Sequence, residues 1–245
     1  MNALVRGPLC AAAITITLVS ILGAASADDG ALRPEFVQAQ QANAAALREY
    51  TWKSRTELSL RGEVKSVTLD QVRYDLDGRR QKTRIGGSAE PSAASADRFD
   101  PLRPPAGPVR RIVAAKKKAE FEDLMHDLSA LVESYAHPSL ETLHAFGRQA
   151  ARTKTIEAGL VRVQARNLVV TGDSMIVWID PLTSMIRRTE IDTTLHGERV
   201  EVAVDHRSLP NGLTYQARTL LRYPSKQMAL TIETYDHQHV QGGSR

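Results

Sequence analysis

The period of the hydrophobic pattern changes along the chain, and each change predicts a new element. Over residues 50–61 apolar and polar positions alternate, which predicts a β-strand with one covered and one solvated face. The apolar side of this strand carries Trp52, Leu58 and Leu60, and the polar side includes Lys53. We therefore expect these three large apolar side chains to point into a core.

Further strands are expected where short apolar runs lie between turn signals such as Asp-Gly and Pro-Asn-Gly. Because these turns have hairpin length, neighbouring strands should be antiparallel. In chain order the runs are 64–74, 80–85, 160–170, 175–180, 185–195, 199–205, 213–223 and 227–235.

A period near 3.6 residues predicts helices at 34–48 and 109–135, and a shorter helix that opens at Pro138. Sheets and helices with one apolar face bury those faces against each other. The predicted fold class is therefore α+β, a curved antiparallel sheet with helices across its apolar face. The stripe of the middle helix that should face the sheet includes Phe121, Leu124, Met125 and Leu128.

Residues 86–108 interrupt this pattern with a Gly-Gly pair, several Ser and Ala residues, and five prolines. This composition does not favour a regular element and predicts a long surface loop. We expect residues 28–245 to form a single domain that contains the loop.

The beginning of the chain has the pattern of a secretory signal peptide. A positive start at Arg6 precedes an apolar run over residues 9–22, and small residues at Ala25 and Ala27 fit a signal peptidase. The alternative, an uncleaved anchor, would need about 20 apolar residues, and this run is shorter and contains two threonines. We expect cleavage after Ala27 and a mature protein in the bacterial periplasm, without a membrane span.

Composition narrows the chemistry further. The expected leader contains Cys10, the one cysteine of the chain, so the mature protein would have neither a disulfide nor a thiol nucleophile. The formal net charge of +4 falls to about +3 once Arg6 is removed. An excess this small does not indicate a nucleic-acid partner.

Residues 173–192 read DSMIVWIDPLTSMIRRTEID, and this run resembles the lipoprotein-carrier-like group of envelope proteins, the LolA/LolB type. In that group a strand of the form Trp-Ile-Asp-Pro-x-Thr turns and returns through a charged strand. The Leu-Pro-Asn-Gly turn at 209–212 and the Tyr-Gln-Ala-Arg strand at 215–218 continue the pattern. The chain is also similar to a set of uncharacterised secreted bacterial proteins, and the resemblance covers about residues 34–85 and 155–235.

The resemblance implies an unclosed half-barrel with an apolar concave face that helices cap, and in the carriers this cavity takes acyl chains. We therefore expect a non-enzymatic protein that binds a hydrophobic ligand, or a lipid-bearing segment of a partner, in the cavity. The alternative is a cavity plugged by the helices, with a role in envelope protein–protein interaction or sensing. The residues expected to bind the ligand are Trp52, Leu58, Leu60, Trp178, Phe121, Leu124, Met125 and Leu128. The two tryptophans also fit a second interpretation, as ordinary core residues of a curved sheet.

Other chemistry has less support in the sequence. The basic run Arg110, Arg111 and Lys116–Lys118 fits either an anionic surface or a solvated helix end. The pair His237 and His239 has strand spacing but no third ligand nearby, so no metal site is expected. No nucleophile motif or phosphate loop is present, and we expect neither a cofactor nor catalysis.

Overall fold

The computed structural model describes residues 34–75, 78–89, 108–136 and 140–240. The expected signal peptide, residues 1–27, and residues 90–107 of the expected loop lie outside the described residues. The division of the chain into a leader and one domain therefore stays a prediction.

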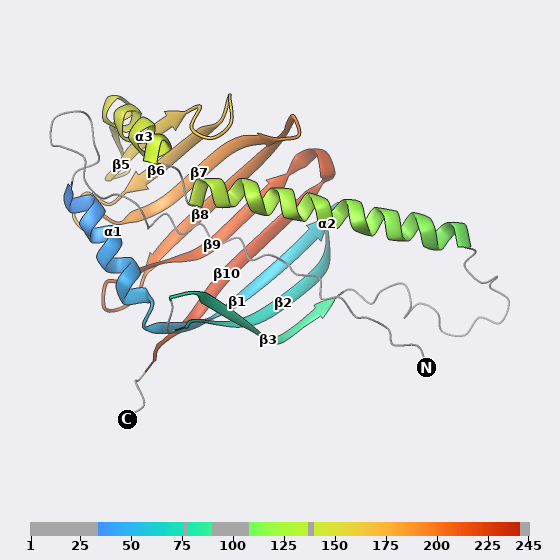
Figure 1. Ribbon diagram of the computed structural model, residues 1–245. Coiled ribbons are helices and arrows are strands. Elements are labelled where there is room, and N and C mark those ends of the chain that lie inside the picture. The colour runs from blue at the N-terminus through green and yellow to red at the C-terminus, as the bar shows by residue number, and fades with distance from the viewer. Residues whose placement is uncertain (1–33, 76–77, 90–107, 137–139, 241–245) are drawn as a thin grey trace.

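The described chain contains long strands and three α-helices, in the order that the hydrophobic pattern predicts (Figure 1). The helices are α1 (Pro34–Leu47), α2 (Pro108–Ala136) and α3 (Leu140–Thr153), with a short 3₁₀ helix η1 (Pro224–Lys226). The strands are β1 (Tyr50–Leu60), β2 (Glu63–Tyr74), β3 (Arg80–Ala89), β4 (Thr155–Glu157), β5 (Leu160–Arg166), β6 (Ser174–Ile179), β7 (Ile186–Leu195), β8 (Glu198–Ser208), β9 (Thr214–Tyr223) and β10 (Met228–His239).

These strands form one antiparallel sheet of ten strands in the order β3-β2-β1-β10-β9-β8-β7-β6-β5-β4. The chain runs outward through β1, β2 and β3 to one edge and restarts at the opposite edge with β4. It then returns strand by strand until β10 pairs with β1. Within the described residues β3 and β4 each pair on one side only, so the sheet is not closed. The predicted fold class, an α+β half-barrel with an antiparallel sheet, is confirmed.

This topology requires a connection from one edge of the sheet to the other, and α2 and α3 belong to it. Nine strand spacings of about 4.8 Å amount to roughly 43 Å. A helix of 29 residues, the length of α2, is about as long. Figure 1 shows α2 lying across the sheet on the same side as α1 and α3, with its N-terminal end extending past the strands.

The two faces of the sheet differ sharply. The covered face is apolar, and its central residues from β8, β9 and β10 are almost completely buried: Val200, Val202, Val204, Leu221, Leu230 and Ile232. The opposite face carries exposed ion pairs such as Arg188–Asp205 at 2.7 Å and Arg199–Asp192 at 2.6 Å. Exposed pairs of this kind contribute about 0–1 kcal/mol each. Burial of the apolar face against the helices is therefore the main stabilising term.

One sequence prediction was wrong at the third strand. Residues 86–89 were expected to open the long loop, but they continue β3 and pair with β2 as far as Ala89. A register shift follows Leu69 of β2, and Gly87 adopts φ +136°. A Cβ atom at Gly87 would lie 2.3 Å from the Val67 carbonyl oxygen. Gly87 thus permits the two strands to approach closely, at a Gly-Gly pair whose composition alone suggested the end of the strand.

The C-terminal half of α2 is anchored by a buried carboxylate. The Tyr135 hydroxyl donates to Asp173 Oδ2 at 2.6 Å, and the Thr193 hydroxyl lies 2.8 Å from the Tyr135 oxygen. Asp173, 1% exposed, also accepts from the backbone N–H groups of residues 168–170 at 2.7–2.9 Å. Burial alone would raise the pKa of Asp173, but the bonds from Tyr135 and the backbone outweigh it and lower that pKa.

Replacing Asp173 should be severely destabilising. Asp173→Ala leaves three backbone N–H groups without their acceptor, at about 1–3 kcal/mol for each buried unsatisfied group, and leaves the Tyr135 hydroxyl with Thr193 alone. We expect the free energy of unfolding in urea to fall by on the order of 4 kcal/mol. The matched control is Asp192→Ala on the solvated face of β7, which should cost under about 1 kcal/mol. If both variants lost less than about 1 kcal/mol of unfolding free energy, Asp173 would not anchor α2.

The same carboxylate should make stability depend on pH. Because the folded pKa of Asp173 lies below its ordinary value of 3.8, its contribution is fully present above that value. The contribution is lost as the pH falls through the lower, folded pKa. We therefore expect the stability gap between wild type and Asp173→Asn to be wide at about pH 7 and to narrow below about pH 4. Urea unfolding at several pH values measures the gap, and a constant gap would refute an ionised Asp173.

Candidate functional site

The apolar face is sealed beneath the C-terminal turns of α2 and less completely covered by the apolar residues that precede them. Leu128, Leu131, Val132 and Tyr135 of α2 are all buried to 9% exposure or less. One to two turns earlier in α2, exposure rises: Phe121, Leu124 and Met125 are only partly buried against the same core. Leu58 and Leu60 of β1 are partly buried against it as well. We call these five half-buried residues the open end of the core.

Seven of the eight residues predicted to bind a ligand lie on the covered side of the sheet. Leu58 is opposite Leu230, and Leu60 is opposite Met228, both core residues. Trp52 is opposite the buried Val72, which places the indole on the same face. The four residues from α2 form the stripe that packs on the core, and Leu128 is the one at 0% exposure.

Trp178 is the exception, and the prediction that it lines the concave face is wrong. Its neighbour Val177 points into the core at 2% exposure, so Trp178 points to the opposite face. There it lies opposite Arg188 and Arg162, and the Arg162 guanidinium carbon is 5.8 Å from the centre of its ring. The run 175–179 is apolar on both faces, so alternation could not show which face is inside.

An aromatic row crosses four adjacent strands at the other end of β1. The rings of Tyr74 and Trp52 are 5.6 Å apart, Trp52 stacks on His237 at 5.9 Å, and His237 lies 4.0 Å from Tyr215. The strands involved are β2, β1, β10 and β9. Burial lowers the pKa of His237 to about 4, so its ring is neutral at neutral pH.

A β-bulge places His237 in this row. Thr51 pairs with Gln238 and Lys53 with Tyr235, so two residues of β10, Asp236 and His237, oppose Trp52 alone. Asp236 adopts φ +56° and forms an ion pair with Lys53 at 2.7 Å. A bulge turns the side chains that follow it to the other face of the strand. The alternation of apolar and polar residues in the sequence does not show where this change of face occurs. Sequence reasoning therefore missed the row.

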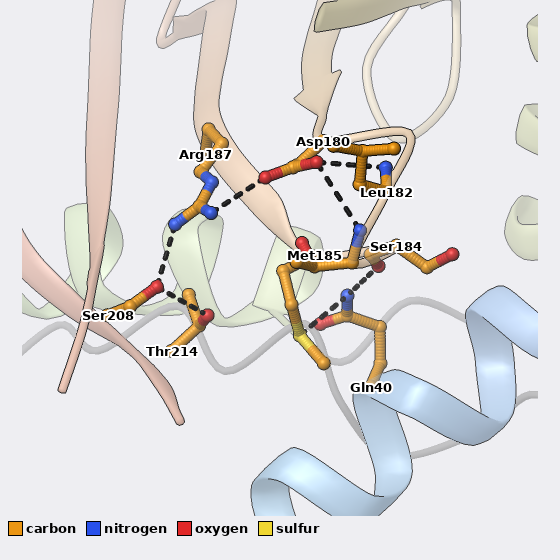
Figure 2. A network of polar contacts seen from close by, with 9 residues as sticks. Gln40, Asp180, Leu182, Ser184, Met185, Arg187, Ser208 and Thr214 are labelled. Carbon is orange, nitrogen blue, oxygen red and sulfur yellow. Dashed lines mark hydrogen bonds and ion pairs between the residues drawn. The ribbon is translucent and has the colours of Figure 1, made fainter. Parts of the chain in front are cut away.

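Helix α1 is held at one end of the covered face by two buried amides, Gln40 and Asn43. Figure 2 shows the contacts of Gln40. Gln40 donates to the carbonyl oxygen of Ser184 at 2.8 Å. Asn43 donates to the Thr214 carbonyl at 2.7 Å and accepts from the Thr214 N–H at 2.6 Å. The Asn43 side chain thus pairs with β9 as a strand backbone would, and it holds α1 against the strand ends.

The Trp-Ile-Asp-Pro-x-Thr sequence serves this same end of the sheet. Asp180 accepts from Arg187 at 2.7 Å and from the backbone N–H of Leu182 at 2.9 Å (Figure 2). The Arg187 guanidinium is the main cause that lowers the pKa of Asp180 to about 2. Arg187 also donates to Ser208 on β8 at 2.7 Å. The motif is therefore a structural turn, and it contributes no reactive group.

Polar chemistry elsewhere is limited in the part of the chain that the structure describes. No three potential metal ligands lie together there, and His237 contacts aromatic rings while His239 lies 3.1 Å from Glu49. Burial lowers the pKa of His206 to about 4, and its Nδ1 has no hydrogen-bond partner among the described residues. Among those residues no helix has the length and apolar character needed to cross a bilayer.

The basic run of the middle helix is only partly described. The Lys116 side chain is exposed and lies 3.9 Å from Glu120, one helical turn later. This pair fits the interpretation of a solvated helix surface. The side chains of the other residues of the run, at 110, 111, 117 and 118, lie outside the described ones.

Removing the Asn43 amide should loosen α1. Asn43→Ala leaves the buried N–H and C=O of Thr214 unpaired, so unfolding free energy should fall by about 2–4 kcal/mol. The amide proton of Thr214 should also exchange faster with deuterium. Gln41→Ala, on the exposed side of the same helix, is the control and should leave both quantities nearly unchanged. Unchanged exchange at Thr214 in the Asn43 variant would contradict the pairing.

Similarity to known proteins is found among solved structures and not among sequences. No protein-family model matches the chain, and no curated protein matches it by sequence. A DUF1329 family protein from Desulfovibrio piger is similar at 9% identity and a TM-score of 0.36, over 86% of this chain and 92% of that one. A domain from Vibrio parahaemolyticus named for outer membrane lipoprotein sorting shares 10% identity at a TM-score of 0.38, over 86% and 93%. A LolA superfamily protein from Nitrosomonas europaea shares 8% at 0.31, over 81% and 92%.

Proposed function

We propose that the protein is a non-enzymatic binding protein of the bacterial periplasm that takes a hydrophobic ligand on the concave face of its sheet. The ligand would be a long-chain amphiphile or the lipid-bearing segment of a partner. The signal-peptide pattern of residues 1–27 supports the compartment. One observation carries the binding site: the half-buried apolar side chains at the open end of the core.

The energetic argument rests on incomplete burial. Apolar surface removed from water contributes about 25 cal/mol per Å², or about 0.8 kcal/mol per CH₂ group. Phe121, Leu124 and Met125 retain exposed surface in the described structure, as do Leu58 and Leu60. An acyl chain packed on these side chains would bury both its own methylenes and the remaining protein surface. The same gain is absent at Leu128, which is already at 0% exposure.

The anchor at Asp173 limits how α2 can respond to a ligand. The C-terminal half of the helix is held by Tyr135, and Asp127 lies 3.2 Å from His196 in the turn between β7 and β8. Lifting this half would expose four buried side chains at about 1.5–3 kcal/mol each. We therefore propose that the ligand lies beside Phe121, Leu124 and Met125 near the middle of α2, where no such cost arises, and not beneath the whole helix.

The experiment measures the melting temperature of the delipidated protein with and without dodecanoate. A ligand that binds only the folded state raises the melting temperature in proportion to the logarithm of its concentration. Leu60→Thr, which introduces a residue that favours strands but removes apolar surface, should weaken binding roughly fivefold. Met125→Gln, which keeps the length and helix propensity of the side chain, should act in the same direction.

The matched control is Ile176→Thr. Ile176 lies on the opposite face of β6, between Gln164 and Glu190, so the substitution removes a similar surface far from the proposed site. It should leave dodecanoate affinity unchanged. If dodecanoate produces no shift at saturation, or if Ile176→Thr weakens binding as much as Leu60→Thr, the proposed site is wrong. A protein that binds no amphiphile would favour the alternative, a protein-interaction module with a plugged cavity.

A further inference from the structure

A second partly exposed surface lies at the other end of β1. It is the aromatic row formed by Tyr74, Trp52, His237 and Tyr215, and solvent reaches all four side chains. Trp52 is opposite Val72 and Tyr74 follows Val72 by two residues, so the three side chains share one face. The row crosses four strands, and the three spacings between them amount to about 14 Å. It is therefore long enough for a ligand of more than one ring.

This row is not continuous with the open end of the core. Along β1, Trp52 and Leu60 are about 26 Å apart. Ser54 and Thr56 lie between them at 4% and 6% exposure, so protein atoms already cover the strand there. A molecule bound on the row is therefore distinct from the hydrophobic ligand proposed above.

The edges of the four rings carry polar atoms without a hydrogen-bond partner among residues 34–75, 78–89, 108–136 and 140–240. These atoms are the hydroxyls of Tyr74 and Tyr215, the indole N–H of Trp52 and the two ring nitrogens of His237. Burial lowers the pKa of His237 to about 4, so at neutral pH one ring nitrogen donates and the other accepts. The row thus presents both donors and acceptors around its aromatic faces.

These polar atoms disfavour a hydrocarbon ligand. A buried methylene strengthens binding about fourfold, whereas a polar atom buried without a partner weakens it roughly 5- to 150-fold. Each polar atom left dry would therefore cancel the gain from one or more methylenes. A sugar ring avoids this loss, because its C–H groups pack on aromatic faces while its hydroxyls donate and accept hydrogen bonds.

Charge points to an uncharged ligand. The four rings are neutral at neutral pH, and the charged pair beside them, Lys53 and Asp236, is joined at 2.7 Å. The planes of Trp52 and His237 differ by only 12°, so these two rings give the row a central pair with one orientation. Tyr74 and Tyr215 flank this pair at angles of 54° and 44°.

We propose that the aromatic row binds an uncharged oligosaccharide, with its sugar rings along the four side chains. The face of one sugar would pack on Trp52 and His237, and the tilted tyrosines would contact its neighbours. An extended β-1,4-linked chain suits a row that crosses adjacent strands, whereas an α-1,4-linked chain coils away from it. This site is independent of the proposed hydrophobic ligand.

The test titrates the full chain with cellotetraose, chitotetraose and maltotetraose by calorimetry. Trp178→Phe leaves Trp52 as the one tryptophan, so its fluorescence reports directly on the row. The main variant is Tyr215→Leu, which keeps apolar volume but removes the ring. Its matched control is Tyr235→Leu, because Tyr235 is a 41% exposed tyrosine outside the row, opposite Lys53.

We expect at least one β-1,4-linked tetrasaccharide to bind with a dissociation constant below about 1 mM and to change Trp52 fluorescence. The one that binds more tightly identifies whether the sugar carries N-acetyl groups. Tyr215→Leu should weaken this binding about tenfold, and Tyr235→Leu should leave it within about twofold. Tyr215→Phe, which removes the hydroxyl alone, should weaken it about threefold. Melting temperatures near that of wild type would show that the variants are folded.

Several outcomes would overturn the saccharide site. They are the absence of binding by both β-1,4-linked probes, tighter binding of maltotetraose, and equal losses in Tyr215→Leu and Tyr235→Leu. The hydrophobic site is tested separately, since Leu60→Thr should weaken dodecanoate binding and leave saccharide binding unchanged. If Tyr215→Leu instead weakened dodecanoate binding and no sugar bound, the row would belong to the hydrophobic site.

Discussion

The structure depends on one constraint: an antiparallel sheet with one apolar face must cover that face, and α2 is the element that does so. Its C-terminal half is inserted among core residues and fastened through Tyr135 to a carboxylate, Asp173, that three backbone amides also hold. Because the sheet restarts at its far edge after β3, a long connection across the covered face is built into the topology. The cover is therefore a consequence of strand order as well as of side-chain chemistry.

The same arrangement leaves part of the apolar face incompletely covered. A straight helix over a twisted sheet cannot stay in contact along its whole length, and Figure 1 shows the N-terminal end of α2 leaving the strands. Burial accordingly falls from Leu128 toward Phe121, and Leu58 and Leu60 of β1 are half-buried against the same core. The sealed part of the apolar face can thus stabilise the fold while the less covered part remains available for binding. The ion pairs of the opposite face add little to either.

The fold and the inward-facing positions of seven of the eight proposed ligand residues were predictable because their signals are periodic. The alternation at Trp52, Leu58 and Leu60 identified the inner face of β1, and the 3.6 period identified the stripe of α2. Trp178 was misplaced because its run is apolar on both faces. His237 joins Trp52 only through a bulge, and Gly86–Gly87 continues a strand despite its composition. The contact of Tyr135 with Asp173 spans 38 residues, and no local pattern encodes such a pairing.

The measurement that tests the central claim most directly is a methyl NMR titration with dodecanoate. Met125 lies at the open end of the core, whereas Met175 is 5% exposed in its sealed part, so the two methyl groups report on the two halves. The account predicts that the Met125 methyl resonance shifts and saturates with the ligand while the Met175 resonance stays in place. A shift at Met175 with none at Met125, or no shift at either, would contradict a binding surface beside Phe121, Leu124 and Met125 of α2.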